Sequence, residues 1–293
     1  MNRMRLAMMT LMMAAAFAVG GDSCAASEPG WVGTLLYSRL TDNVWQIWQL
    51  DLASRQARQV TFTPGDKRHP GWAPAGRVIY CTSNQACFQS EPGSAGADLL
   101  LADLWPVRDA AWSPDGQWLA FSRFRTDLVD SANLWIADAG GDNRRVLTHA
   151  PGIQQHPAWS PDGTRLAYSG GQGPRSYELY LVTMDGMQAT RLTTNEAEDL
   201  FPVWSPDGAR IAYSSNASGD YEMWVVGVDG ANAVQLTHAP GLDTNPAWSP
   251  DGEWLAFASN RSGTLEIWVM RPDGSDQQLL EKVEGGACDP AWR

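Results

Sequence analysis

The chain alternates short apolar runs with tight polar turns, and one such unit recurs along it. Four segments carry Trp-Ser-Pro-Asp-Gly followed by an apolar run such as Leu-Ala-Phe-Ser, and these are residues 111–122, 158–169, 203–214 and 247–258. Residues 71–81 are a degraded copy, and residues 290–293 begin a sixth. Proline presets φ at about −65° and glycine lets the chain reverse. Each copy therefore predicts two short strands joined by a turn.

The tryptophan of this unit gives the period of the repeat. It stands at positions 72, 112, 159, 204, 248 and 292, at intervals of 40, 47, 45, 44 and 44 residues. A third predicted strand carries an aromatic residue in five of the units, at positions 48, 135, 180, 224 and 268, and a fourth ends in Leu-Thr in three of them. Four short strands in a period in the forties are typical of one blade of a β-propeller.

The two ends of the chain are incomplete in complementary ways. Residues 32–63 contain strands two to four of a unit without the opening strand, whereas the C-terminus contains the opening strand alone. A ring closes when the last strand completes the first blade, which also removes open sheet edges. We therefore expect an all-β fold, a six-bladed β-propeller over residues 32–293. In it, residues 288–293 pair with the strand around residues 35–38.

The N-terminal segment predicts export. Arg3 and Arg5 precede an apolar stretch of 14 residues, which is too short to span a bilayer. We interpret residues 1–26 as a signal peptide and residues 27–31 as a short linker, which places the mature protein in the periplasm. A lipoprotein anchored through Cys24 and a buried N-terminal helix are the alternatives. No other apolar run is long enough to span a membrane.

The repeated Trp-Ser-Pro-Asp-Gly motif, behind a signal peptide, resembles the TolB-like family of periplasmic propellers with WD40-like (PD40) repeats. The resemblance covers about residues 32–293. It implies a non-catalytic protein-binding propeller that docks an envelope protein or lipoprotein of the Tol–Pal type at the mouth of its channel. The chain has no room for the α/β domain that precedes the propeller in TolB itself, so we expect that domain to be missing.

Composition narrows the classes of partner. The 44% of hydrophobic residues suffices for a sizeable core and excludes general disorder. A formal net charge of −12 disfavours nucleic acid, because phosphate contacts need clustered positive charge. The acidic balance predicts that a partner offers a basic or neutral face. We expect a monomer.

The candidate binding residues share one register of the repeat. The positions three before each marker tryptophan begin the innermost strands, so a closed ring would gather them at one mouth of the channel. These positions, with two arginines directly upstream, are His69, Asp109, His156, Phe201, Asn245, Asp289, Arg68 and Arg108. They differ from one another while the rest of each repeat hardly varies, which indicates roles beyond packing. A solvated rim whose polar groups bond only water and backbone is the alternative.

Signatures of catalysis are missing from the sequence. It contains no Gly-x-Ser-x-Gly elbow, His-Glu-x-x-His pair or phosphate-binding loop. The four aspartates of the Ser-Pro-Asp-Gly turns are expected to be structural. We therefore predict a binding protein without a cofactor, and keep two alternatives open. One is a metal-dependent propeller enzyme of the polysaccharide lyase kind that uses His69 and His156, and the other is a small-molecule or glycan sensor. A channel-bound cation such as calcium, held by Asp109 and Asp289, is a further alternative.

Three cysteines follow the expected signal peptide. Cys81 and Cys87 flank a short predicted hairpin, so we expect them to form a disulfide in the oxidising periplasm. Cys288 then has no partner. Three reduced thiols are the alternative.

Overall fold

The computed structural model describes residues 30–94, 96–104, 106–125, 131–171 and 176–293. The expected signal peptide, Cys24 and residues 27–29 of the expected linker lie outside these residues. All of the described strands lie in one compact unit, residues 32–293. In the described part, no helix has the length and apolar character needed to cross a membrane.

The described residues form short strands and two 3-10 turns, with bounds as follows. They are β1 (Thr34–Thr41), β2 (Val44–Asp51), β3 (Gln56–Gln59), β4 (Lys67–Trp72), η1 (Pro74–Gly76), β5 (Val78–Thr82), β6 (Cys87–Ser90), β7 (Asp98–Leu100), η2 (Ala102–Leu104), β8 (Val107–Trp112), β9 (Trp118–Phe124), β10 (Ala132–Asp138), β11 (Arg145–Val146), β12 (Ile153–Trp159), β13 (Arg165–Gly171), β14 (Glu178–Thr183), β15 (Ala189–Arg191), β16 (Asp199–Trp204), β17 (Arg210–Ser215), β18 (Glu222–Gly227), β19 (Val234–Gln235), β20 (Asp243–Trp248), β21 (Leu255–Ser259), β22 (Glu266–Met270), β23 (Gln278–Glu281) and β24 (Ala287–Trp292).

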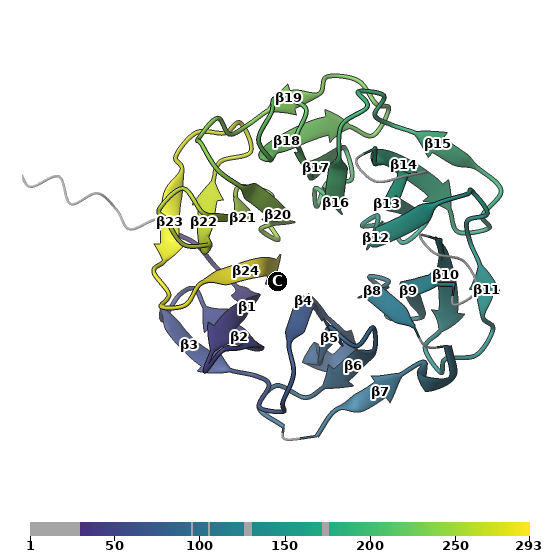
Figure 1. Cartoon of the computed structure of the whole chain (residues 1–293), viewed down its shortest axis with the longest axis horizontal. Coiled ribbons are helices and arrows are strands. Elements are labelled where there is room, and N and C mark those ends of the chain that lie inside the picture. The colour runs from purple at the N-terminus through teal and green to yellow at the C-terminus, as the bar shows by residue number, and fades with distance from the viewer. Residues whose placement is uncertain (1–29, 95, 105, 126–130, 172–175) are drawn as a thin grey trace, which may run out of the picture. The chain divides into compact units, whose positions relative to one another are not determined.

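The prediction of an all-β propeller is confirmed. The sheets are arranged around a common centre, with β4, β8, β12, β16, β20 and β24 innermost (Figure 1). The described strands make four separate four-stranded sheets rather than six, together with one eight-stranded sheet. The larger sheet arises because β10 and β12 pair in parallel at Ala132 and Ile153, which joins the strands β8–β11 to the strands β12–β15.

The C-terminal strand belongs to the same sheet as the first strands. β24 pairs antiparallel with β1, with Trp292 opposite Leu35 and Cys288 opposite Ser38. The backbone of Arg293 also exchanges two hydrogen bonds with Thr34. The sheet β24-β1-β2-β3 therefore combines the two ends of the unit 32–293.

The Ser-Pro-Asp-Gly segments form one recurrent turn. In the first, Ser113 Oγ donates to Asp115 Oδ1 at 2.6 Å, and the same oxygen accepts the backbone N–H of Gln117. Ser113 Oγ also accepts the N–H of Trp118. The turns at residues 160–165, 205–210 and 249–254 repeat this network. The expected structural role of the turn aspartates is confirmed, because each satisfies the backbone of its own turn.

The hydrophobic core lies between successive blades. One cluster packs Leu134 and Ile136 of β10 against Leu166 and Tyr168 of β13, all nearly inaccessible to solvent. The marker tryptophans add a hydrogen bond across the same boundaries. The indole N–H groups at positions 72, 159 and 204 donate to the backbone carbonyls of residues 291, 111 and 158, each on the preceding inner strand.

The threonines of the Leu-Thr strings, and Thr61 of Val60-Thr61, tie the outer end of a blade to its own third strand. The hydroxyl of Thr61 accepts the N–H of Ile47, and Thr148, Thr193 and Thr237 do the same for β10, β14 and β18. A buried polar side chain meets this threonine in three blades, and these side chains are Gln46, Gln154 and Glu222. The repeated threonines therefore satisfy polar groups that are out of reach of water.

Cys81 and Cys87 are joined by a disulfide. They lie opposite each other in the β5–β6 hairpin, with their Cα atoms 4.0 Å apart. Both are buried in the cluster between β5–β6 and β8–β9. Cys288 is a free, buried thiol.

We expect non-reducing peptide mapping of the exported protein to find residues 81 and 87 linked and residue 288 free. Replacing both linked cysteines by alanine should lower the free energy of unfolding by roughly 2 kcal/mol, the size expected for a loop this short. Recovery of both thiols in the free state would contradict the bridge.

Candidate functional site

The six predicted mouth positions share one unusual backbone conformation. His69, Asp109, His156, Phe201, Asn245 and Asp289 all have φ between 52° and 55°. At each of them the pairing of the inner strand with its neighbour skips two residues, which is a β-bulge. Bulges re-aim side chains and are frequent beside functional sites. The repeat thus projects six side chains of four kinds toward the channel.

This conformation is uncommon for residues other than glycine. Asparagine, aspartate and histidine adopt the left-handed region more often than other non-glycine residues, whereas phenylalanine does so less readily. Left-handed non-glycine residues cost of the order of 1–3 kcal/mol each and persist where the surrounding structure fixes them. Here the fixing comes from the two flanking stretches of strand pairing, which hold the bulge from both sides.

Three of the mouth residues form a cluster of rings. The Phe201 ring lies 4.0 Å from the His156 ring and 5.8 Å from the His69 ring, centroid to centroid. The two histidine rings are 6.2 Å apart. These residues come from β4, β12 and β16, so the cluster reaches across the channel rather than along one sheet.

Asp289 is the best-satisfied charged group of the site. Its carboxylate accepts from Arg68 Nε at 2.7 Å, from Ser38 Oγ at 2.9 Å and from the His69 backbone N–H at 3.2 Å. Burial alone would raise the pKa of Asp289, but His69 and Arg68 more than offset this and hold it below its usual range. Asp289 is therefore an ionised carboxylate with a built-in counter-ion.

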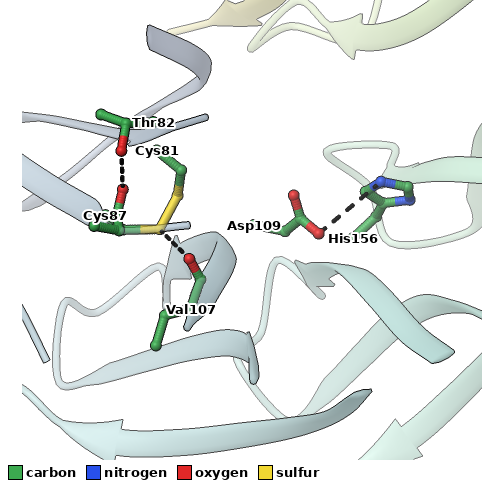
Figure 2. The surroundings of a disulfide bond; sticks show 7 residues. Cys81, Thr82, Cys87, Val107, Asp109 and His156 are labelled. Carbon is green, nitrogen blue, oxygen red and sulfur yellow. Dashed lines mark hydrogen bonds and ion pairs between the residues drawn. A yellow bond between two sulfur atoms is a disulfide. The ribbon is translucent and has the colours of Figure 1, made fainter. Parts of the chain in front are cut away.

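Asp109 and His156 face each other beside the disulfide hairpin (Figure 2). Asp109 Oδ2 lies 4.0 Å from His156 Nε2, and the Nδ1 atom of the same ring is buried and has no hydrogen-bond partner among the described residues. Burial lowers the pKa of His156 to about 4, although the nearby Asp109 acts in the opposite direction. The imidazole is therefore neutral at pH 7.

This histidine should make stability depend on pH. Between pH 6.5 and about 4 the unfolded chain binds a proton at His156 and the folded chain does not, so folding weakens as the pH falls. The expected loss reaches roughly 3 kcal/mol at pH 4, from about 1.4 kcal/mol per pKa unit. Urea unfolding at pH 7 and pH 4 would measure it.

A His156→Asn variant supplies the comparison, because asparagine tolerates the left-handed backbone. The variant is needed because burial also raises the pKa of Glu222, whose effect on stability has the opposite sign. His238→Asn removes an exposed imidazole and serves as the control. If wild type and His156→Asn lose the same stability between the two pH values, the buried neutral histidine is contradicted.

The remaining predicted residues lie at the edges of the cluster. The Arg108 guanidinium stacks on the Phe124 ring at 4.7 Å, and the backbone N–H of Asn245 donates to Ser214 Oγ at 3.2 Å. The structure thus brings together the rings of His69, His156 and Phe201 and the carboxylates of Asp109 and Asp289. Arg68 is bound to Asp289, and Asn245 and Arg108 line the surrounding cavities.

Two cavities meet at the ring cluster. The first, which we call the lumen, has about 290 Å³ and is lined by inner-strand residues such as Trp72, Trp112 and Phe201. The second, which we call the vestibule, has about 340 Å³ and is lined by Arg68 and Arg108 among others. His69, Asp109 and His156 line both cavities. The cluster therefore stands between an aromatic chamber and an arginine-lined one.

Asp109 and Asp289, the two carboxylates that the sequence suggested as ligands of a cation, each lie beside a different basic side chain. Asp289 is bound by Arg68, whereas Asp109 faces His156. Within the described part of the chain, no group of three or more His, Cys, Asp or Glu side chains is arranged to hold a metal ion.

The sequence did not predict that a set of acids near the inner strands is buried. Glu178 and Asp199 are buried together, as are Glu222 and Asp243, and burial raises the pKa values of Asp199 and Glu222. The recurrence of Glu at the start of the third strand of these blades, before the Leu-Thr string, is the signal that marks them. Lys67, one residue before Arg68, is also buried, and its ammonium donates to backbone carbonyls of residues 63–65.

Comparison with solved structures supports the fold. A putative TolB from Agrobacterium tumefaciens is 23% identical, with a TM-score of 0.70 over 86% of this chain and 90% of that one. TolB from Acinetobacter baumannii is 19% identical, with a TM-score of 0.75 over 89% of this chain and 66% of that one. An oligogalacturonate lyase in complex with manganese is 17% identical, with a TM-score of 0.60 over 86% and 77% of the two chains. At these identities the likeness establishes the fold alone.

Comparison with family models assigns the chain to a family, whereas comparison with single curated proteins does not. No curated protein matches the chain. The model of the PD40 family, the TolB β-propeller domain, matches residues 97–233 and 201–292, which together make up about two thirds of the sequence. With the repeat, the sheets and these matches in agreement, the chain belongs to the PD40 family of TolB β-propeller domains.

Proposed function

We propose that this chain is an exported propeller that binds an envelope protein or lipoprotein, of the Tol–Pal type, at the channel mouth. The observation that carries the proposal is the set of six bulges. One backbone conformation is repeated six times, yet the side chains it projects are two histidines, two aspartates, a phenylalanine and an asparagine. Packing requires repetition, so variation confined to this register favours recognition.

The proposal includes a ring of six blades closed by β24, in which the eight-stranded sheet counts as two blades. Three contacts support it. β24 pairs with β1, β24 contacts both β20 and β4, and the Trp72 indole donates to the carbonyl of Ala291. A closed ring would hold the six bulges at fixed positions, so that the mouth is rigid before a partner arrives.

The mouth has the anatomy of a protein-docking surface. Phe201 is its apolar member and contacts two imidazole rings, and the carboxylates of Asp109 and Asp289 line the same cavity. Aromatic anchors near the centre of an interface contribute most of the binding energy in many complexes. Binding by these side chains needs no cofactor, and we propose that the protein acts as a monomer in the periplasm.

Site-specific cross-linking tests this function. The photoreactive residue p-benzoylphenylalanine at position 201 should cross-link one defined envelope protein. The same residue at position 187 should not, because Met187 is 84% exposed in the β14–β15 turn, at the outer edge of its sheet and not on an inner strand. Equal cross-linking from both positions, or cross-linking from position 187 alone, would place the docking surface elsewhere.

A further inference from the structure

Asp109 carries a largely buried carboxylate with no hydrogen-bond donor among the described residues. Its side chain is 10% exposed, and within the described residues its one ion-pair contact is with His156, whose Nε2 lies at 4.0 Å. That distance exceeds a hydrogen bond. Because burial keeps His156 neutral at pH 7, it offers no positive charge to Asp109. The symmetry-related Asp289, in contrast, accepts from three donors.

The lumen around Asp109 suits a positively charged organic group. Trp72, Trp112 and Phe201 line it, and no lysine or arginine does within the described residues. Aromatic faces attract ammonium and guanidinium groups. A buried carboxylate that lacks a counter-ion adds a stronger attraction, because burial weakens the screening by water.

We propose that the lumen binds the side chain of a lysine or arginine, whose cationic end lies against the Asp109 carboxylate and among the aromatic rings. The source is an exposed segment of the docked partner, so its identity rests on the proposed function. The chemistry of the lumen itself stands on the observations given above.

The charges outside the lumen are compatible with binding of a lysine or arginine side chain. Arg68 and Arg108 line the vestibule, where Asp289 neutralises Arg68 and the Phe124 ring covers Arg108. The chain as a whole carries a formal net charge of −12, which attracts a basic segment at long range. A calcium ion would need six to eight oxygen ligands. Aromatic rings cannot supply these, so the lining favours an organic cation.

The experiment uses capped amino acids as probes of the full mature chain. Nα-acetyl-lysine N-methylamide and its arginine counterpart should bind at pH 7, as measured by calorimetry and by shifts of the tryptophan indole NMR signals. The norleucine counterpart has nearly the same shape without the charge, and it should bind at least tenfold more weakly. A separate titration with calcium chloride alone tests whether the site binds a metal ion instead.

The decisive variant is Asp109→Asn. Asparagine tolerates the left-handed backbone of this position, so the bulge should persist. We expect the variant to bind the lysine and arginine probes at least tenfold more weakly, with the norleucine probe unaffected. Asp220→Asn removes one exposed charge elsewhere and should leave all affinities unchanged.

The proposal is overturned if the charged probes bind no better than norleucine, if Asp109→Asn leaves their affinity intact, or if calcium binds at Asp109 and the probes do not. These results are distinct from failure of the docking function. A partner that still cross-links at position 201 while the probes fail leaves docking intact. Probes that bind normally while cross-linking fails leave the cation site intact.

Discussion

Deletion of residues 287–293 is expected to abolish cooperative unfolding or to lower the Tm by at least about 10 °C. The deletion removes β24, whose residues Ala287, Cys288 and Asp289 are almost fully buried. It also exposes the edge of β1 and takes the acceptor from the Trp72 indole. A loss of more than about 4 kcal/mol follows, and in a domain of this size about 1 kcal/mol corresponds to 2–4 °C.

Calorimetry of the truncated and full chains measures this effect. The control is Val234→Pro in β19, an outer strand that pairs on one side only and is half exposed there. Its Tm should fall by a few degrees at most, because no sheet lies beyond it. A truncated chain that melts like the full one would contradict closure of the ring by β24.

The architecture was open to prediction because the repeat encodes it several times. Packing between blades asks for the same tryptophan, turn and apolar run in each unit, so the period of the marker tryptophans indicated the propeller and the strand pair 35–38 with 288–293. The number of separate sheets could not be predicted from the sequence. A single parallel pair at Ala132 and Ile153 merges two four-stranded sets, and no local motif marks that pair.

The candidate site was predictable in its register but not in its geometry. Counting back from each tryptophan found six positions that share a bulge. The contacts between them depend on side chains far apart in sequence, such as His69 and His156, whose rings lie 6.2 Å apart. The lone carboxylate of Asp109 is likewise invisible in the sequence, because Asp289 occupies the same register and is fully bonded.

Replacement of His69, His156 and Phe201 together by alanine is expected to reduce capture of the cross-linked partner at least a hundredfold. The three rings contact one another across the channel and form the centre of the proposed interface. Aromatic anchors at such centres typically contribute 2 kcal/mol or more each, so the loss of three of them exceeds two decades of affinity.

The same triple variant should melt within a few degrees of the wild type. Its side chains project from bulges into the channel, whereas the cores between blades are built from other residues such as Leu134, Ile136 and Leu166. Met187→Ala, in the β14–β15 turn at the outer edge of its sheet, is the control and should leave capture unchanged. Surface plasmon resonance with the purified partner measures the affinity. If the triple variant binds it with undiminished Kd, the partner docks at another surface, and the variation among the six bulges reflects drift at a solvated rim.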